Sequence, residues 1–216
     1  ANGTFMEARS GKPAETMQDL IRQFDALSPG ERVRDADYRA ASAGYFAAMV
    51  TAPLNKESLQ AAAVPFIDHT AALNARAALS APMTLFLVRN LKIFFLTRHI
   101  PFRQIAEAIT QDGIIEAMPL CATYLRQLAL DDPLIAVAAL NPHGGEQGLF
   151  GNEEQRIIEP AVMQLKHQGV NVSGPHSGDT IFYRAYHGEF DAVIPMYHDQ
   201  GLAPFKLIAF DQGVNF

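Results

Sequence analysis

The sequence predicts an α/β fold from its patterning and its composition. Short apolar runs alternate with segments of helical periodicity, and no internal repeat or linker rich in Gly, Ser or Pro interrupts the alternation. The 216 residues are 49% hydrophobic and 19% charged, which is enough to bury a sizeable core and excludes a disordered chain. This length suits one domain or two small ones.

Helices are expected where apolar residues recur with helical spacing between start and stop signals. The clearest candidate covers residues 153–167, with acids in its first turn, Lys166 and His167 in its last, and Gly169 just beyond. The other expected helices cover residues 15–27, 35–48, 56–63, 71–79, 102–110 and 122–130.

Strands are expected at short, mostly apolar segments, which lie at residues 47–50, 134–140, 191–196 and 205–210. The run at 134–140 is typical of a strand buried on both faces. Residues 83–88 and 91–96 form either two strands around Arg89 and Asn90 or one long bent strand.

Charge and cysteine usage bound the partners and the compartment. The net charge of −6 argues against nucleic acid, because no basic excess neutralises phosphates. The single cysteine, Cys121, excludes an internal disulfide framework, indicates a reducing compartment and is read as a small core residue. No apolar signal-peptide segment is found, and the run 83–96 is too short and too charged to span a bilayer. We therefore expect a cytoplasmic protein without a membrane partner.

Three of the expected strands are followed by histidines. These are His99 after the run 91–96, His143 after the run 134–140, and His198 with Asp199 after the run 191–196. In open α/β sheets, ligands bind outside the carboxyl ends of the strands. If the three strands are parallel neighbours, these side chains converge on one crevice.

Imidazoles beside a carboxylate suit a divalent metal ion. Such an ion could bind a substrate hydroxyl and carboxylate and lower the pKa of the hydroxyl. The alternative is that each histidine only satisfies loop hydrogen bonds. His198 is either a ligand or a residue that positions Asp199.

Further polar segments each allow two interpretations. The glycine-rich residues 143–151 either bring backbone N–H groups to an anion or form an ordinary strand-to-helix loop capped by Asn152. His69 and Thr70 either bind an anionic substrate or form a capping loop. Lys206 is either an anion partner, and so with Asp199 a candidate catalytic residue, or a solvated lysine.

The remaining histidines, His167, His176 and His187, lie near expected helix ends and turns and are read as surface residues. Neither a P-loop nor a G-x-G-x-x-G fingerprint is present, which speaks against a standard Rossmann dinucleotide site in this chain.

Several longer motifs, in order and spacing, resemble the 4-hydroxythreonine-4-phosphate dehydrogenase family of pyridoxal phosphate biosynthesis. They are Thr-Ala-Pro-Leu-Asn-Lys-Glu at 51–57, Asn-Pro-His-Gly-Gly-Glu at 141–146, Gly-Pro at 174–175, Asp-Thr at 179–180, Met-Tyr-His-Asp-Gln-Gly at 196–201 and Gly-Val-Asn at 213–215. The resemblance covers roughly residues 48–215 and is more specific than any single motif.

This resemblance implies an isocitrate/isopropylmalate dehydrogenase-like α/β/α sandwich and a homodimer with a shared active site. It implies an NAD- or NADP-linked oxidation of a secondary alcohol, assisted by a divalent metal ion (Zn²⁺, Mg²⁺ or Co²⁺). In the namesake reaction, 4-(phosphooxy)-L-threonine is oxidised at C3 and the β-keto acid then loses CO₂. The partner is therefore a small phosphorylated or acidic hydroxy acid.

The same resemblance implies roles for individual residues. The strand ending in Thr-His in the family matches Arg98 and His99 here, which makes His99 a metal ligand, and the Asn-Pro-His motif makes His143 another. The Gly-His-Thr-Glu motif matches residues 68–71 and assigns His69 and Thr70 to the substrate, and Asp199 is expected near metal and substrate.

The sequence departs from the family pattern around the substrate motif. Asp68, Ala71 and Ser177 stand where the family has Gly, Glu and Pro. Related dehydrogenases act on phosphorylated four-carbon sugar acids and on cis-dihydrodiols of aromatic dicarboxylates, so such a catabolic substrate is an alternative. We expect residues 1–216 to be a single family region, the central part of a longer two-lobed dehydrogenase whose terminal segments are absent here.

Two other classes of function stay open. One is a metal-dependent hydrolase or lyase without nicotinamide, with Asp199 or Glu146 as general base. The other is a non-catalytic remnant that binds a small acid or dimerises with an intact partner.

Overall fold

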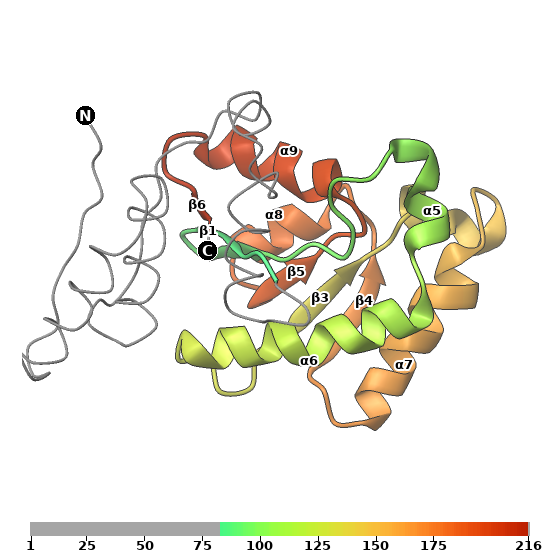
Figure 1. Cartoon of the computed structure of the whole chain (residues 1–216), viewed down its shortest axis with the longest axis horizontal. Coiled ribbons are helices and arrows are strands. Elements are labelled where there is room, and N and C mark those ends of the chain that lie inside the picture. Colours follow the sequence, from blue (N-terminus) through green and yellow to red (C-terminus); the bar gives the residue numbers. More distant parts are fainter. Residues whose placement is uncertain (1–82, 216) are drawn as a thin grey trace, which may run out of the picture. The chain divides into compact units, whose positions relative to one another are not determined.

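A mixed six-stranded sheet forms the centre of the described part of the chain, residues 83–215 of a computed structural model (Figure 1). Its strands are β1 (Phe86–Val88), β2 (Leu91–Ile93), β3 (Ile135–Ala138), β4 (Val172–His176), β5 (Ala192–Ile194) and β6 (Val214–Asn215). Their order is β4-β3-β5-β2-β1-β6, with β4, β3, β5 and β2 mutually parallel and β1 antiparallel to both β2 and β6.

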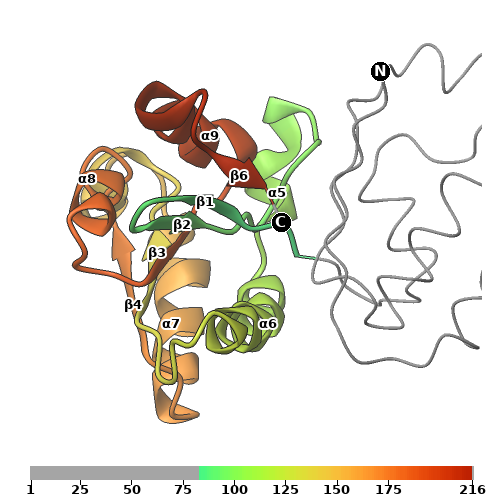
Figure 2. The ribbon, with the colours of Figure 1, turned by 90° about the vertical axis from the view of Figure 1, so that its left-hand side faces the viewer.

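Helices cover both faces of this sheet (Figure 2). The longer elements are α6 (Gln111–Gln127), α7 (Glu159–His167), α8 (Ile181–Tyr186) and α9 (His198–Ala209). The short ones are the 3₁₀ turn η1 (Phe102–Gln104), α5 (Ile105–Ala108), the 3₁₀-like η2 (Pro142–Gly148) and the π-helix η3 (Glu154–Ile158).

Strand β3 shows how the sequence separates the two faces. Ile135 and Val137 pack in the core formed with α6 and α7, whereas Ala136 and Ala138 pack in the core formed with α8 and α9. Successive side chains of a strand point to opposite faces of the sheet, so a continuous apolar strand is buried on both of its faces. The expected α/β fold and the doubly buried strand at 134–140 are confirmed.

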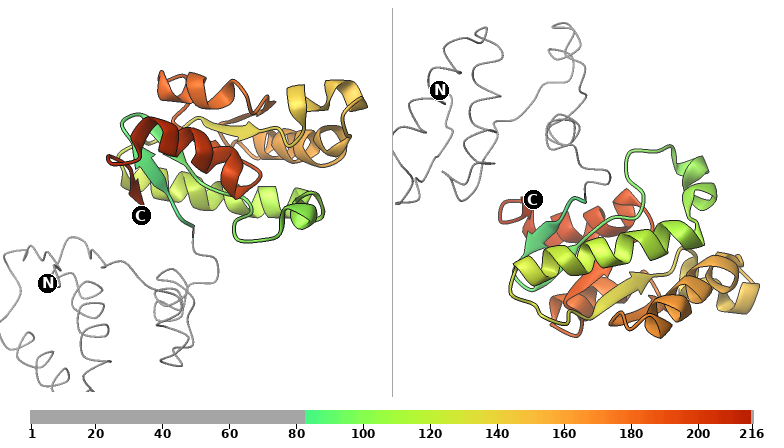
Figure 3. Two further views of the ribbon diagram at one scale, coloured as in Figure 1. Left: turned by 90° about the horizontal axis from the view of Figure 1, so that it is seen from above. Right: turned by 60° about the horizontal axis from the view of Figure 1, so that its bottom comes forward.

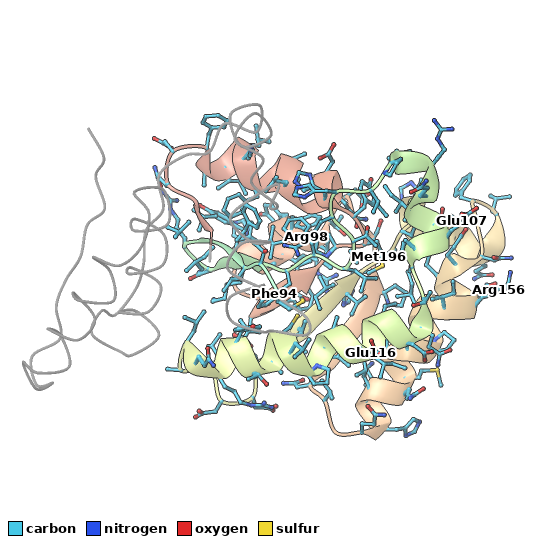
Figure 4. The ribbon with its side chains drawn as sticks, in the orientation of Figure 1. Phe94, Arg98, Glu107, Glu116, Arg156 and Met196 are labelled. Carbon is cyan, nitrogen blue, oxygen red and sulfur yellow. The ribbon has the colours of Figure 1, made fainter. Side chains whose placement is uncertain are left out.

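Side chains just beyond the ends of β2 and β5 are buried as well. Phe94 and Met196 lie fully buried, while Glu107, Glu116 and Arg156 point to solvent (Figure 4). Cys121 is also fully buried, on α6, and burial raises the pKa of its thiol. It is the small core residue that the sequence predicts.

The segment 83–96 forms a hairpin rather than one bent strand. Phe86 pairs with Ile93, Val88 pairs with Leu91, and Arg89 turns the chain at a φ of 50°. The sequence predicts one helix over residues 102–110, but these residues form only η1 and the single turn α5. Helix α5 ends at Ala108 because the next residue, Ile109, has extended φ and ψ angles.

Helix α6 starts earlier than residues 122–130 suggest, crosses the sheet (Figure 3, right) and ends before Leu130. The Thr110 side chain caps it by accepting a hydrogen bond from the Gly113 N–H at 3.1 Å. Gly113 and Pro119 have low helix propensity, so the sequence does not predict a helix over the first half of α6. Tertiary burial of Ile114 and Met118 outweighs that cost.

The strand expected at 205–210 is wrong, because these residues continue helix α9. Only Phe205 and Ala209 of this apolar run are buried, four residues apart, as one face of a helix requires. Leu207 and Phe210 are exposed. A mostly apolar segment therefore resembled a buried strand, although four of its six residues are exposed.

Strand β4 was not expected, since Val172–His176 is mostly polar and contains Pro175. It lies at the edge of the sheet, where proline is tolerated. Gly174 has a φ of +136°, and a Cβ there would stand 2.6 Å from the Val137 carbonyl oxygen. Only glycine allows β4 to approach β3 so closely.

The helix expected at 153–167 is confirmed as η3 followed by α7. No helix in the range 83–215 has the length and apolar character needed to cross a membrane. The expected elements at 15–79 and the residues His69 and Thr70 lie outside the described residues.

Candidate active site

The three strands whose ends carry histidines are parallel neighbours in the sheet, in the order β3-β5-β2. The chain leaves β3 toward η3 and α7 on one face, whereas it leaves β5 into α9 on the other face. A crevice opens where neighbouring strands send their connections to opposite faces. The parallel arrangement on which the prediction depends is therefore present, and the carboxyl ends of the three strands lie at one edge of the sheet. Of the four side chains expected in one crevice, only His143 and Asp199 line the cavity described next, whereas His99 and His198 do not.

An open cavity of about 1250 Å³ occupies this edge, between the end of β3, α5, α8 and α9. Its walls are mostly aromatic and aliphatic, and several polar side chains converge on it. Those used below are His143, Glu153, Asp179, His187, Asp199 and Gln200. A large hollow with a few convergent polar groups is the usual form of a ligand site.

His143 enters the cavity on a left-handed turn. The five residues from His143 to Gln147 all have positive φ, from 45° to 79°. Its Nδ1 lies 3.7 Å from Asp179 Oδ2, and both side chains are more than half exposed. Non-glycine residues pay for such a conformation, so the surrounding contacts must hold it.

Two glutamates at the start of the next helix bind the residues that lead into this turn. Glu154 is buried and its Oε1 accepts hydrogen bonds from the Leu140 and Asn141 N–H groups, at 2.8 and 2.7 Å. The Asn141 Nδ2 donates to Glu154 Oε2 at 3.0 Å and to Glu153 Oε2 at 2.6 Å. The Asn141 hydrogen bond is the main cause that lowers the pKa of Glu153.

The glycine-rich segment thus has a structural role. The backbone N–H groups of Leu140 and Asn141, just before it, bind the protein's own carboxylate. The Asn152 carbonyl accepts from the Arg156 N–H at 2.9 Å, as an N-cap carbonyl does. A Cβ on Gly151 would stand 2.4 Å from Asn141 Nδ2. The interpretation as an anion-binding loop stays a prediction.

The end of β5 is held by an amide. Gln200 Oε1 accepts from the Met196 N–H at 2.7 Å, and its Nε2 donates to the Ala139 carbonyl at 2.6 Å. One side chain therefore joins the carboxyl ends of β5 and β3. A Cβ on Gly201 would stand 2.7 Å from Pro195 Cγ, so glycine lets α9 lie close against the sheet.

His198 and Asp199 begin helix α9. His198 Nδ1 lies 2.7 Å from Asp199 Oδ1, and the His198 ring lies 5.4 Å from the His99 ring, centroid to centroid. The segment leading to His99 is tied to β5, since Thr97 Oγ1 donates to the Met196 carbonyl at 2.7 Å. Arg98 anchors the same segment through a hydrogen bond to the Thr84 hydroxyl.

The predicted site residues therefore fall into separate groups. His143 and Asp199 line the cavity, whereas His99 and Lys206 do not. Lys206 lies exposed on α9 with its Nζ 5.8 Å from the centre of the Phe210 ring. Within 83–215, no three His, Cys, Asp or Glu side chains lie close enough together to hold a metal ion.

The sequence reasoning missed Glu153, Glu154 and Gln200, and gave Asp179 no role of its own. Neither burial nor the direction of a side chain back toward the preceding strand is visible in a sequence. The only usable signal was position, because each of these residues lies within a few residues of a strand-end motif.

His176 was expected at the surface but is half-buried at the end of β4. Its Nδ1 lies 3.2 Å from Arg184 Nη1 and its Nε2 contacts the Ser173 hydroxyl. Since arginine only donates, Nδ1 is the acceptor and Nε2 carries the proton. Burial, and then the charge of Arg184, lower the His176 pKa. His167 and His187 are exposed, as predicted.

Comparison with known proteins identifies the family. Residues 33–216 match the family described as "Pyridoxal phosphate biosynthetic protein PdxA". The chain belongs to this family. A PdxA relative from Symbiobacterium thermophilum, provisionally named D-threonate 4-phosphate dehydrogenase, is 47% identical over 168 residues, which cover 78% of this chain and 50% of the relative. A relative of the same name from Halalkalibacterium halodurans is 40% identical over the same coverage.

Solved structures of two dehydrogenases resemble the fold as well. The 4-hydroxythreonine-4-phosphate dehydrogenase of Klebsiella pneumoniae matches with a TM-score of 0.76 and 37% identity, over 88% of this chain and 62% of that one. The terephthalate 1,2-cis-dihydrodiol dehydrogenase of Burkholderia xenovorans matches with a TM-score of 0.65 and 27% identity, over 83% and 57%. The chain spans about half the length of the curated relatives it matches.

Proposed function

We propose that the protein containing this chain is a dehydrogenase that oxidises a secondary alcohol of a phosphorylated four-carbon hydroxy acid, with NAD or NADP as hydride acceptor. Membership of the PdxA family supports the reaction class. The observation that carries the proposal is the cavity at the ends of β3 and β5, which is lined by both His143 and Asp199 from two separate strand ends. The proposal includes loss of CO₂ from the β-keto acid product.

Asp199 is proposed as the group that receives the proton of the substrate hydroxyl. Its side chain is 85% exposed and lies at the cavity, so substrate can reach it. The neighbouring imidazole of His198, 2.7 Å away, holds the carboxylate in place. Lys206 remains a prediction as a second catalytic residue, because its described contacts lie outside the cavity.

A divalent metal ion is proposed as a cofactor, with His99 and His143 as ligands. The donor types fit, since the same edge of the sheet presents a His99–His198 pair and a His143–Asp179 pair. The described side chains do not yet form a set of three donors, so a further donor or a shift of the His143 turn is required. When bound, such an ion lowers the pKa of a substrate hydroxyl and stabilises negative charge on the product oxygen.

The substrate phosphate needs a separate subsite. Among the described residues that line the cavity, the carboxylates and imidazoles are His143, Glu153, Asp179, His187 and Asp199, with no lysine or arginine. An acidic lining repels a phosphate. His69 and Thr70 are therefore proposed to hold the anionic end of the substrate, as the family motif implies.

Two substrates of the class deserve first testing. They differ at C2, which carries a hydroxyl in D-threonate 4-phosphate and an amino group in 4-(phosphooxy)-L-threonine. We propose D-threonate 4-phosphate first, because the 47%-identical relative has that name. We further propose a cytoplasmic homodimer with a shared active site and an isocitrate/isopropylmalate dehydrogenase-like fold.

The test uses the full-length protein with each substrate, with NAD and with NADP, and measures reduced nicotinamide by absorbance and CO₂ by trapping. A chelator arm, followed by return of Zn²⁺, Mg²⁺ or Co²⁺, tests the metal. Chelator-sensitive formation of reduced nicotinamide from either substrate supports the proposal. Substrate consumption without nicotinamide reduction would instead indicate a hydrolase or lyase and overturn it.

A further inference from the structure

Glu154 is a buried charged side chain that the proposed chemistry does not use. It is 1% exposed, and Thr84 is the only other side chain among the buried polar and charged groups of residues 83–215. Removing a carboxylate from water is costly unless hydrogen-bond donors surround it. The hydrogen bonds that the Glu154 carboxylate accepts must therefore offset the cost of burying it.

Every hydrogen bond described for the Glu154 carboxylate comes from the end of β3. Oε1 takes the Leu140 and Asn141 N–H groups, and Oε2 takes the Asn141 side-chain amide. The strand ladder has ended at this point, so the carboxylate supplies the acceptors that a neighbouring strand would have supplied. These contacts fix the direction in which the chain leaves β3 toward His143.

The turn that carries His143 also packs on this carboxylate. Gly145 is buried at a φ of +79°, and a Cβ there would stand 2.7 Å from Glu154 Oε2. The adjoining Gly144 has a similar φ of +68° but open space around it. The carboxylate therefore touches one specific residue of the left-handed turn, two positions after His143.

We propose that Glu154 is a positioning residue for His143, and that it acts by holding the left-handed turn 143–147 against the end of β3. The catalytic consequence rests on the proposed function, whereas the positioning itself does not. The role requires a carboxylate rather than an amide. In Glu154→Gln the new NH₂ group faces the NH₂ group of Asn141, so two donors oppose each other.

Asn141 cannot resolve this conflict by turning its amide around. Its NH₂ group also donates to Glu153 Oε2, so a flip would place its carbonyl against that carboxylate. The double variant Glu153→Gln/Glu154→Gln removes the obstacle, because a flipped Asn141 carbonyl can then accept from both new amides. The geometry thus predicts that a second substitution rescues the first.

The experiment measures hydrogen–deuterium exchange of residues 139–150 by mass spectrometry in the full-length protein. Glu154→Gln should speed exchange there by about 10-fold or more, without a matching change in peptides from α6. Glu153→Gln, and Glu159→Gln at an exposed position on α7, should leave it near the wild-type rate. The double variant should return it toward wild type. Unchanged exchange in Glu154→Gln, or no recovery in the double variant, would overturn the proposal.

Steady-state kinetics with the substrate found above give the second readout. Glu154→Gln should lower kcat by about 10- to 100-fold, in the range typical for groups that orient a functional side chain, and the double variant should recover most of it. Faster exchange with unchanged kcat would overturn the catalytic role of the turn. If the wild-type protein has no activity, the proposed function fails, while the exchange data still decide whether Glu154 holds the turn. If Glu154→Gln does not fold, the double variant decides.

Discussion

The carboxyl ends of β3 and β5 lie side by side, and their backbone groups find hydrogen-bond partners in two different ways. Each strand end receives a side chain from the start of the following helix, Glu154 for β3 and Gln200 for β5. After β3, the chain makes a left-handed turn of five residues before its helix begins. After β5, Tyr197 is the N-cap and helix α9 starts at once.

The difference follows from what the two side chains can bind. A carboxylate only accepts, so Glu154 gathers three donors from one strand end and stabilises a turn made of strained residues. An amide both donates and accepts, so Gln200 joins the ends of two strands. The Glu154 carboxylate thus shapes one loop, whereas the Gln200 amide sets the spacing between the ends of β3 and β5.

Adjacent glycines give the sharpest test of the carboxylate-centred turn. Gly145→Ala should destabilise the protein by about 2–4 kcal/mol, because it adds a contact with Glu154 Oε2 at 2.7 Å to the cost of positive φ. Gly144→Ala should cost only about 1–2 kcal/mol, since it meets open space. Urea unfolding of both variants measures the difference, and equal losses would show that Glu154 does not constrain the turn.

The amide bridge has the next largest expected effect. Gln200→Ala leaves the Ala139 carbonyl and the Met196 N–H unpaired and should cost about 1–3 kcal/mol, with lower turnover as the strand ends lose their alignment. Gln164→Ala, which removes an exposed hydrogen bond to Gln111, is the matched control and should cost about 0.5 kcal/mol or less. Similar losses in the two variants would contradict a special role for Gln200.

The close approach of α9 to the sheet can be tested at Gly201. A methyl group there would stand 2.7 Å from Pro195 Cγ and 2.9 Å from Phe95 Cε1. Gly201→Ala should cost about 1–2 kcal/mol, because overpacking outweighs the gain in helix propensity. Thermal unfolding measures this change, and a stabilised variant would show that α9 can shift away from the sheet without loss.

The end of β4 extends the comparison to a third strand and should show the smallest effect. The His176 pKa lies below its ordinary value of 6.5, so below pH 6.5 the unfolded chain binds this proton before the folded protein does. Stability should therefore fall as the pH drops from 6.5 toward the folded-state pKa. Lys166 and Arg184 favour the neutral ring and Glu189 opposes them.

Thermal unfolding between about pH 8 and about pH 5 measures this dependence. His176→Gln should flatten the curve in that window, whereas the exposed His167→Gln should not. Equal curves for wild type and His176→Gln would contradict the assignment.

The sequence predicted what depends on local patterning. Continuous apolar runs located β3 and β5, and the polar residues after them located the crevice. It did not predict β4, whose polar residues reflect an edge position, nor helix α9, which ends in the segment 205–210 that was expected to be a strand. The pattern of apolar residues therefore predicts a wrong element where apolar side chains lie at the surface.

The contacts that shape the site were beyond sequence reasoning for a different reason. Gly144 and Gly145 are adjacent glycines that the sequence alone cannot tell apart. They differ in the structure because a Cβ on Gly145 would meet Glu154 Oε2, whereas one on Gly144 would meet open space. Gln200 meets Ala139, which lies 61 positions earlier in the chain. Such pairings arise from the order of strands in the sheet, which local propensity does not contain.

The most direct test of the central claim is kcat/KM for oxidation of D-threonate 4-phosphate in His143→Asn and Asp199→Asn. Asparagine tolerates the positive φ at position 143 and keeps a polar side chain at both sites, so folding should persist. If the crevice between β3 and β5 is the active site, both variants should lose about 100-fold or more, while His167→Asn at the surface keeps wild-type activity. Wild-type activity in both crevice variants would contradict the account.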